Sequence, residues 1–344
     1  MSIKSAFKLI LNLSLRAAFT LKIDLLLNKN KLLVLMYHGV TDKKVLRGSV
    51  ENYDGKHVFA KKFENQLKKL SKRYTPISLA QLNSWILNKK KLPKNPILFT
   101  FDDGYENNYS IVYPLLKKYN VPAIIFVCPD LVGTINWPDK VEWIIANAQS
   151  KKIFIFLNKK LLHFNLNSDS EKINAIIRLK KEFADIATQK REEKINELVK
   201  TTRAKLNFSG NYKLMNWNKI KELSENGIAI CSHSMTHPAL TKEPPQKVKE
   251  ELEKSKKIIE NKTKILCTAL AYPSGIYDET VKKITKETEY LCAFTVDFGK
   301  NTKQTDKFAI KRIPVTNNQS NTILFINLIF NFNKLLFKMR KWLA

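Results

Sequence analysis

Short apolar runs alternate with amphipathic stretches along much of the chain. The runs at 33–38, 97–101 and 123–128 have the length and continuous hydrophobicity of strands that are buried on both faces. This alternation predicts a parallel α/β fold in which strands and helices follow one another. On the same basis we expect helices at about 60–72, 79–89, 107–119, 216–225 and 245–261, further strands at 228–233 and 266–272, and a polar loop at about 39–56.

The alternation is interrupted between residues 139 and 211. This stretch is rich in Lys and Glu, contains a possible β-hairpin at 152–166, and is otherwise expected to be helical. We interpret it as an insertion or lid outside the main α/β unit. The chain is therefore divided into a helix at 1–30, a first α/β part at 31–138, the insertion at 139–211, a second α/β part at 212–318 and a helix at 319–344.

Both ends of the chain have the pattern of basic amphipathic helices. Apolar and basic residues occupy opposite sides in each, and Trp342 stands near the C-terminus. No run reaches the ~20 apolar residues that a spanning helix needs. Helices of this kind lie in the headgroup region of membranes, so we expect contact with an anionic membrane surface. Packing of both helices on the main α/β unit is the alternative.

The first residues lack a clear signal-peptide core, because Lys8 and Arg16 interrupt the apolar stretches. We therefore expect a peripheral protein on the cytoplasmic face of the cytoplasmic membrane. An outward-facing protein with an uncleaved N-terminal anchor is the alternative.

The charge balance is strongly basic, with 60 Lys and Arg against 31 Asp and Glu and a formal net charge of +29. Such a surface favours anionic partners, although a composition rich in Lys, Asn and Ile explains part of the excess. Zinc-finger spacing and aromatic RNA-binding motifs are absent, so nucleic acid is not an expected partner. The four cysteines form no C-x-x-C pair and are expected to be buried free thiols. The oligomeric state is not indicated.

A pair of carboxylates, Asp102 and Asp103, follows the apolar run at 97–101, and Gly104 comes next. Functional groups of parallel α/β folds gather at the carboxyl ends of strands. Neighbouring strand residues point in opposite directions, so the two aspartates need not have one role. A solvated strand-end turn is the alternative interpretation.

Two histidines, His233 and His237, lie four residues apart after the expected strand at 228–233. A loop that curls back can bring such a pair to one metal ion. Together with one aspartate they would form a facial site that leaves positions open for water and substrate. The ion would acidify its bound water and polarise a carbonyl, and the remaining aspartate could act as a general base. This set of residues suits the hydrolysis of an amide or ester.

The sequence resembles the polysaccharide deacetylases, the NodB-homology or carbohydrate esterase family 4 enzymes. Thr100–Gly104 (TFDDG) and His233–His237 (HSMTH) are similar to the first two motifs of that family, and the resemblance covers about 33–138 and 212–316. It implies a distorted (β/α)7-type barrel. It also implies that Asp102 is the general base and that Asp103, His233 and His237 bind a divalent metal, with Zn²⁺ expected first and Co²⁺ or Ni²⁺ as alternatives.

The third motif of the family resembles Ala271–Gly275 (AYPSG), and there the Tyr272 backbone N–H is expected to stabilise the oxyanion. Two departures from the family pattern stand out. The usual Arg of this motif is absent, and Arg312 is our candidate to orient Asp102 in its place. No His follows His237, but Met36–Val40 (MYHGV) resembles the motif of a branch in which His38 would be the general acid. We assign no role to His57, which falls in a loop expected to be mobile.

The predicted function is metal-dependent removal of N-acetyl groups from an amino sugar in a polysaccharide, lipopolysaccharide or lipid-linked glycan. Two alternatives remain open: an O-deacetylase of an acetylated glycan that uses the same ion, and a non-catalytic barrel that binds glycan.

Overall fold

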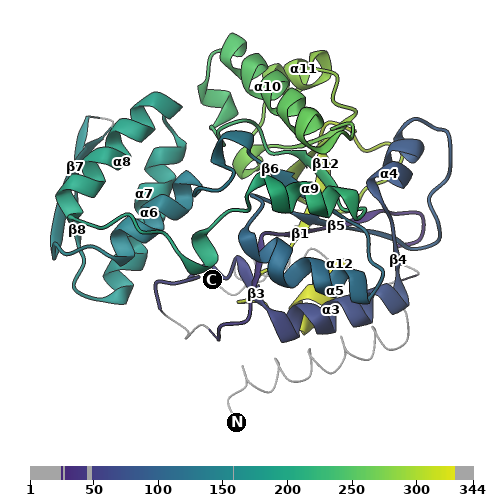
Figure 1. Cartoon of the computed structure of the whole chain (residues 1–344), viewed down its shortest axis with the longest axis horizontal. Coiled ribbons are helices and arrows are strands. Elements are labelled where there is room, and N and C mark those ends of the chain that lie inside the picture. Colours follow the sequence, from purple (N-terminus) through teal and green to yellow (C-terminus); the bar gives the residue numbers. More distant parts are fainter. Residues whose placement is uncertain (1–24, 26–27, 45–48, 158, 330–344) are drawn as a thin grey trace, which may run out of the picture.

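A closed barrel of parallel strands forms the centre of the computed structural model, which describes residues 25, 28–44, 49–157 and 159–329 (Figure 1). The pairing of β1 with both β5 and β12 closes the ring, so the expected (β/α)7-type barrel is confirmed. The seven strands are β1 (Leu33–Tyr37), β5 (Pro96–Phe101), β6 (Ala123–Val127), β9 (Ala229–Ser232), β10 (Ala269–Ala271), β11 (Cys292–Phe298) and β12 (Ile310–Pro314). A short β4 (Thr75–Pro76) also pairs with β5.

The continuous apolar runs arise because the barrel strands are covered on both faces. Every residue of β1, β5 and β6 is buried, with side chains packed either in the barrel interior or against the surrounding helices. The sequence pattern did not indicate β11, β12 or the helix between β10 and β11. In β12, Lys311 and Arg312 interrupt the apolar run. Arg312 is nevertheless fully buried, because its guanidinium pairs with Asp102.

The helices around the barrel are amphipathic and bury their apolar faces against it. In α3, for example, Phe63, Leu67 and Leu70 are fully buried. The expected helix at 107–119 is a π-helical turn followed by a short α-helix, because Pro114 cannot donate the hydrogen bond of a regular helix. The surrounding helices are α3 (Ala60–Arg73), α4 (Leu79–Ile86), η1 (Asn108–Val112), α5 (Tyr113–Lys118), α9 (Trp217–Glu225), α10 (Pro245–Thr263) and α11 (Glu279–Glu287).

Residues 137–212 form a lobe beside the barrel, at the left of Figure 1. Ile153, Ile155, Leu179 and Leu198 belong to a hydrophobic core that is separate from the barrel core. The hairpin expected at 152–166 is present and antiparallel. The elements of the lobe are α6 (Trp137–Ala146), β7 (Lys152–Leu157), β8 (Lys160–Asn165), α7 (Asp169–Ala184), α8 (Thr188–Thr202) and the 3₁₀ turn η3 (Gly210–Tyr212).

The loop expected at 39–56 is more ordered than the sequence indicates. It begins with β2 (Gly39–Thr41), which pairs with β3 (His57–Phe59). The prediction that His57 is mobile is wrong: its side chain is buried, and its Nδ1 accepts a 3.0 Å hydrogen bond from the Asn107 side-chain amide. A Cβ at Gly39 would lie 2.0 Å from the imidazole, so only glycine fits there. The remaining 3₁₀ turns are η2 (Pro129–Leu131), η4 (Leu240–Lys242) and η5 (Pro273–Gly275).

The described part of the C-terminal helix, α12 (Asn321–Ile329), packs on the barrel. Leu324 and Leu328 belong to the barrel core, and the Asn28 side chain donates a 2.9 Å hydrogen bond to the Leu328 carbonyl. These two side chains therefore show the expected alternative, packing of the helix on the main α/β unit. The rest of the two expected terminal helices, 1–24, 26–27 and 330–344, lies outside the described residues.

Among the helices that are described, none combines the length and the hydropathy needed to cross a bilayer. All four cysteines are buried and free, as expected.

Candidate active site

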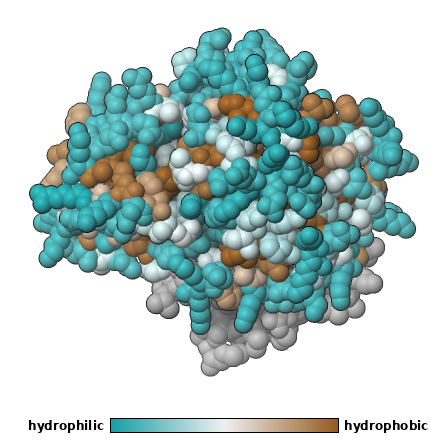
Figure 2. Space-filling view, viewed as in Figure 1, coloured by the Kyte–Doolittle hydropathy of each residue, from teal (hydrophilic) through white to brown (hydrophobic). Residues whose placement is uncertain are grey.

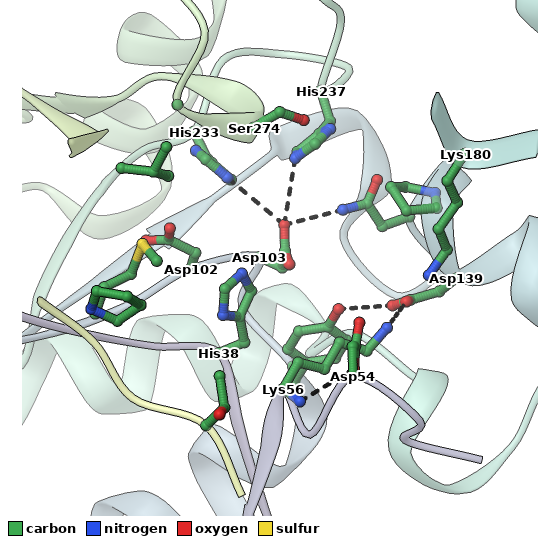
Figure 3. Close-up of a pocket in the computed structure, with 18 of the residues that line it drawn as sticks. His38, Asp54, Lys56, Asp102, Asp103, Asp139, Lys180, His233, His237 and Ser274 are labelled. Carbon is green, nitrogen blue, oxygen red and sulfur yellow. Dashed lines mark hydrogen bonds and ion pairs between the residues drawn. The ribbon is translucent and has the colours of Figure 1, made fainter. Parts of the chain in front are cut away.

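Five of the expected site residues gather at the carboxyl ends of the barrel strands and line a cavity of about 320 Å³: His38, Asp102, Asp103, His233 and His237. Asp102 and Asp103 follow β5, His233 follows β9, and His38 follows β1. Parallel strands present their carboxyl ends at one rim, so segments far apart in sequence meet there. The lobe at 137–212 supplies the opposite wall (Figure 3).

Asp103, His233 and His237 form one cluster of potential metal ligands. The Nε2 atoms of both histidines lie 3.6 Å from Asp103 Oδ1, and the three donor atoms lie within 4.8 Å of one another. Four-coordinate Zn²⁺ with bonds of ~2.1 Å separates its ligands by roughly 3.4 Å. All three side chains are buried, so an ion here would be shielded from bulk water on the protein side. The donor set and its spacing fit a divalent metal such as Zn²⁺.

The protonation states also suit a metal site. His233 Nδ1 donates a 2.7 Å hydrogen bond to the Ala271 carbonyl oxygen, which turns Nε2 towards Asp103. Burial, and then the charge of His233, lowers the pKa of His237 to about 3, so this ring is neutral at physiological pH. Neutral imidazoles are the form that binds metal.

Several non-glycine residues at the rim hold left-handed backbone conformations. Asp103 has φ 72°, Ser234 has φ 65°, His237 has φ 57° and Ser274 has φ 55°. Such conformations cost free energy and persist where packing and hydrogen bonds enforce them. Gly104 has φ 73°, and a Cβ there would lie 2.8 Å from Val127. The sharp turns after β5 and β9 thereby aim the ligand side chains into the cavity.

Two side chains that the sequence analysis missed hold these ligands. Glu251 of α10 accepts 2.9 Å hydrogen bonds from the amides of Met235 and Thr236, and a 2.8 Å bond from the Thr236 hydroxyl. It therefore ties down the loop between His233 and His237. Asn136 donates a 2.9 Å hydrogen bond to Asp103 Oδ1. No local sequence signal marks either residue, because both act across the fold.

Asp102 forms a buried two-point ion pair with Arg312. Nη1 and Nη2 of Arg312 donate to the two carboxylate oxygens at 2.7 and 2.8 Å, and Nε donates to the Thr295 carbonyl. Burial opposes ionisation, but Arg312, followed by His233, lowers the pKa of Asp102 to about 2. Asp102 is therefore a carboxylate at physiological pH, and the structure places Arg312 where the sequence analysis expected it.

His38 lines the same cavity, across from the two metal-site histidines (Figure 3). Its backbone carbonyl accepts a 2.8 Å hydrogen bond from Asn108 of η1, which orders the turn between β1 and β2. The half-buried imidazole is thus held at the edge of the cavity and can exchange protons with a bound molecule.

The prediction that the Tyr272 amide stabilises an oxyanion is wrong. This N–H donates a 3.0 Å hydrogen bond to the Phe294 carbonyl, because β10 and β11 pair there. The Tyr272 ring is also fully buried, and its hydroxyl donates to the Phe308 carbonyl. Ser274, two residues later, lines the cavity instead.

A network of buried charges forms the wall of the cavity on the lobe side. Lys56 pairs with Asp139 and with Glu142, and Lys180 donates to Glu142 at 2.9 Å. Tyr105 also donates to Asp139, at 2.7 Å. Each buried charge has a partner, so the network joins the 49–59 segment to the lobe without leaving an unpaired ion.

Asp54 differs from the rest of this wall because its carboxylate is exposed. The only hydrogen bond that this carboxylate accepts from a described residue comes from the Lys56 amide, at 3.1 Å. Partial desolvation of the Asp54 carboxylate by the surrounding protein opposes its ionisation, but Lys56 and Lys180 outweigh that effect and lower the pKa of Asp54. Figure 3 places it between His38 and Asp139. It is an ionised acceptor that faces the cavity with unused hydrogen-bonding capacity.

Comparison with known proteins finds a family model described as polysaccharide deacetylase, which matches residues 89–150 and 185–293. YxkH of Bacillus subtilis (strain 168), a protein assigned to the polysaccharide deacetylases, is 23% identical over 287 residues, which are 83% of this chain and 72% of that protein. The poly-β-1,6-N-acetyl-D-glucosamine N-deacetylase of Staphylococcus aureus is 30% identical over 118 residues, which cover 32% of this chain and 40% of that enzyme.

Two solved structures share the fold. The Streptococcus pyogenes deacetylase PplD, in complex with acetate, has a TM-score of 0.58 and 20% identity, with 87% of this chain and 98% of that chain covered. IcaB from Ammonifex degensii has a TM-score of 0.55 and 15% identity, with 88% and 98% covered. At these identities the likeness shows the fold alone. The segment at 151–184, which includes β7 and β8, falls between the two parts that the family model matches.

Proposed function

Since the chain belongs to the polysaccharide deacetylase family, we propose that it removes N-acetyl groups from an amino sugar of a glycan with the help of a divalent metal ion. Asp103, His233 and His237 would hold the ion. Zn²⁺ is the first choice and Co²⁺ or Ni²⁺ are alternatives, because two imidazoles and one carboxylate suit all three ions.

One observation carries this proposal: the three potential ligands meet beside a separate carboxylate that they do not use. Asp102 is held by Arg312, whereas Asp103 is turned towards the two histidines. A binding module has no need of a buried carboxylate at the edge of a metal site. Hydrolysis of an amide needs both groups, one to bind the ion and one to accept the proton of the attacking water.

When bound, the ion would polarise the acetamido carbonyl and acidify a water molecule. Asp102 would take the proton from that water. Its lowered pKa keeps the carboxylate ionised at physiological pH, so it is free to accept that proton. Arg312 keeps Asp102 ionised and fixes the direction of its oxygens, because both guanidinium N–H groups are engaged at once.

His38 would donate a proton to the departing sugar amine from the other side of the cavity. Ser274 takes the place that the sequence analysis gave to Tyr272. Its left-handed conformation sets it at the cavity, and its amide donates no hydrogen bond to the described backbone. That amide is therefore the best candidate for stabilising the negative charge that develops on the carbonyl oxygen.

The proposed substrate is a glycan that contains N-acetylhexosamine. The similarity to the Staphylococcus aureus enzyme, whose name specifies poly-β-1,6-N-acetyl-D-glucosamine, supports an N-acetyl rather than an O-acetyl target. Asp54 on the lobe side of the cavity can accept hydrogen bonds from sugar hydroxyls.

We also propose that the glycan is close to a membrane, as a lipopolysaccharide or lipid-linked precursor would be, and that the protein is peripheral on the cytoplasmic membrane. The net charge of +29 supports attraction to anionic lipid.

Acetate release from N-acetylated and O-acetylated oligosaccharides tests this function. We expect metal-dependent release from the N-acetylated glucosamine oligomers and loss of at least about a hundredfold in kcat for Asp102→Asn. Near-wild-type release by that variant would refute the role of Asp102. Release from O-acetylated sugars alone would favour the O-deacetylase, and stoichiometric metal without any turnover would favour the glycan-binding alternative.

A further inference from the structure

The β7–β8 hairpin has two apolar faces, although only one is needed for folding. Ile153, Ile155 and Leu157 point inwards and are at most 1% exposed, in the core of the lobe. In a hairpin that covers a core on one side, the alternate positions are normally polar. Here the alternate positions of β7 are Phe154 and Phe156, which are 53% and 55% exposed.

The second strand extends this outward face. The antiparallel register pairs Phe154 with His163 and Phe156 with Leu161. Paired residues lie on the same face of a hairpin, so these four side chains form one surface. Leu161 is 65% exposed, and the Phe154 ring stacks on His163 with 5.4 Å between centroids. Space-filling Figure 2 shows hydrophobic side chains on the lobe that carries the hairpin.

Basic residues flank this surface at both ends. Lys151 and Lys152 stand at the start of β7, and Lys159 and Lys160 at the start of β8. All four are exposed, and none forms an ion pair with a described residue. The segment from 150 to 168 contains no Asp or Glu. Exposed aromatic and aliphatic side chains between uncompensated lysines are the composition of surfaces that enter the headgroup region of anionic bilayers.

We propose that the outward face of the β7–β8 hairpin, formed by Phe154, Phe156, Leu161 and His163, binds the surface of an anionic lipid bilayer. Charge decides between a bilayer and a second copy of the chain as the occupant. A second copy would bring four more lysines against these four, whereas acidic headgroups neutralise them. The packing of Leu328 on the barrel removes part of the other apolar surface that the sequence offered for this purpose. This inference does not depend on the proposed catalytic activity.

A fluorophore on the hairpin gives a local test that membrane contact elsewhere in the chain would not mimic. The full chain carrying Phe156→Cys is labelled with an environment-sensitive dye, since the four native thiols are buried. The matched control is Leu266→Cys, at a position 73% exposed on the loop after α10. Both are mixed with vesicles of phosphatidylcholine, with and without phosphatidylglycerol.

We expect a blue shift and protection from aqueous iodide only for the dye at position 156, and only on vesicles that contain phosphatidylglycerol. High salt should reverse both effects. A dye at 156 that stays in water on bound vesicles overturns the proposal, as does an equal shift at position 266. Concentration-dependent dimers without vesicles, or burial of the dye by a soluble anionic polymer alone, would also overturn it.

A second variant removes the apolar surface itself. Phe154→Ser, Phe156→Ser and Leu161→Ser are combined in one chain, and Ile265→Ser with Leu266→Ser is the matched control on exposed apolar residues elsewhere. All of these side chains are exposed, so both variants should retain the fold, which circular dichroism checks. We expect the hairpin variant to partition to anionic vesicles at least about tenfold more weakly, and the control to bind as the wild type does. Equal partitioning of both would contradict the proposal.

Discussion

Arg312 and Asp102 lie 210 residues apart in sequence and meet in a buried pair with two hydrogen bonds, 2.7 and 2.8 Å long. Arg312 is completely buried, and its Nε donates to the Thr295 carbonyl on β11. One side chain of β12 thus crosses the barrel interior to orient a carboxylate that follows β5. The pair serves both the stability of the barrel and the position of the proposed base.

Replacing Arg312 separates these two contributions. Arg312→Ala would leave Asp102 buried without its partner, which typically costs about 3–5 kcal/mol. We expect a fall of that size in the free energy of unfolding, measured by urea denaturation, together with a loss of acetate release. Arg312→Lys keeps the charge but cannot make both bonds, so it should recover stability better than activity. Equal recovery of both would show that two-point orientation is unimportant.

The same pair predicts how stability depends on pH. Asp102 has a pKa of about 2 in the folded protein, below the ~3.9 of an unperturbed Asp. A depressed carboxyl pKa contributes stability that is complete above about pH 5 and is lost as the pH falls towards 2. In metal-free protein, the difference in unfolding free energy between wild type and Asp102→Asn should therefore shrink over this range. A difference that stays constant from pH 5 to 2 would contradict the assigned pKa.

Glu251 is expected to control metal affinity without touching the metal. It holds the Met235 and Thr236 amides, so Glu251→Ala frees the loop that carries His237. Removing such a supporting group typically weakens metal binding about 10–100-fold. Competition with a chromogenic chelator measures this affinity, and Glu250→Ala is the control because Glu250 is a half-buried neighbour on α10 that pairs only with Lys254 among the described residues. Unchanged affinity in Glu251→Ala would contradict the role of Glu251.

Metal removal should inactivate the protein and destabilise it. A ligand that binds only the folded state raises stability in proportion to the logarithm of its concentration over Kd. We therefore expect chelation to lower the melting temperature of the wild type, and added Zn²⁺ to restore it. In His233→Ala neither treatment should have an effect, because one of three ligands is missing. If neither chelation nor added Zn²⁺ changes the melting temperature of the wild type, the metal site is contradicted.

Asp54 is expected to affect substrate binding more than chemistry. A hydrogen bond to a charged group contributes about 1.5–3 kcal/mol, so Asp54→Ala should raise KM by roughly tenfold or more with a smaller change in kcat. Asp169→Ala, an exposed aspartate at the start of α7, serves as the control. A fall in kcat at constant KM would place Asp54 in the reaction rather than in sugar binding.

The apolar pattern by itself determined a parallel α/β fold with a ligand-bearing rim, and the resemblance to a known family added the barrel. Continuous apolar runs predict strands that are buried on both faces. Asp102 and Asp103 follow such a strand directly, so their carboxylates lie at the rim whichever position the strand has in the sheet. The four-residue spacing of His233 and His237 likewise indicates one ion, because a local turn is enough to bring them together. These features depend on residues close in sequence.

Tertiary structure decided what depends on pairing between distant segments. The Tyr272 N–H already donates a hydrogen bond to β11, because β10 and β11 pair there. No local sequence pattern shows which strand lies beside β10. Glu251, Asn136 and the charges around Lys56 reach the site from separate elements, through contacts across the fold. The sequence suggested Arg312 as a candidate, but its contact with Asp102 depends on closure of the barrel. In the closed barrel β1 pairs with both β12 and β5, so the strand that carries Arg312 lies close to the strand that Asp102 follows.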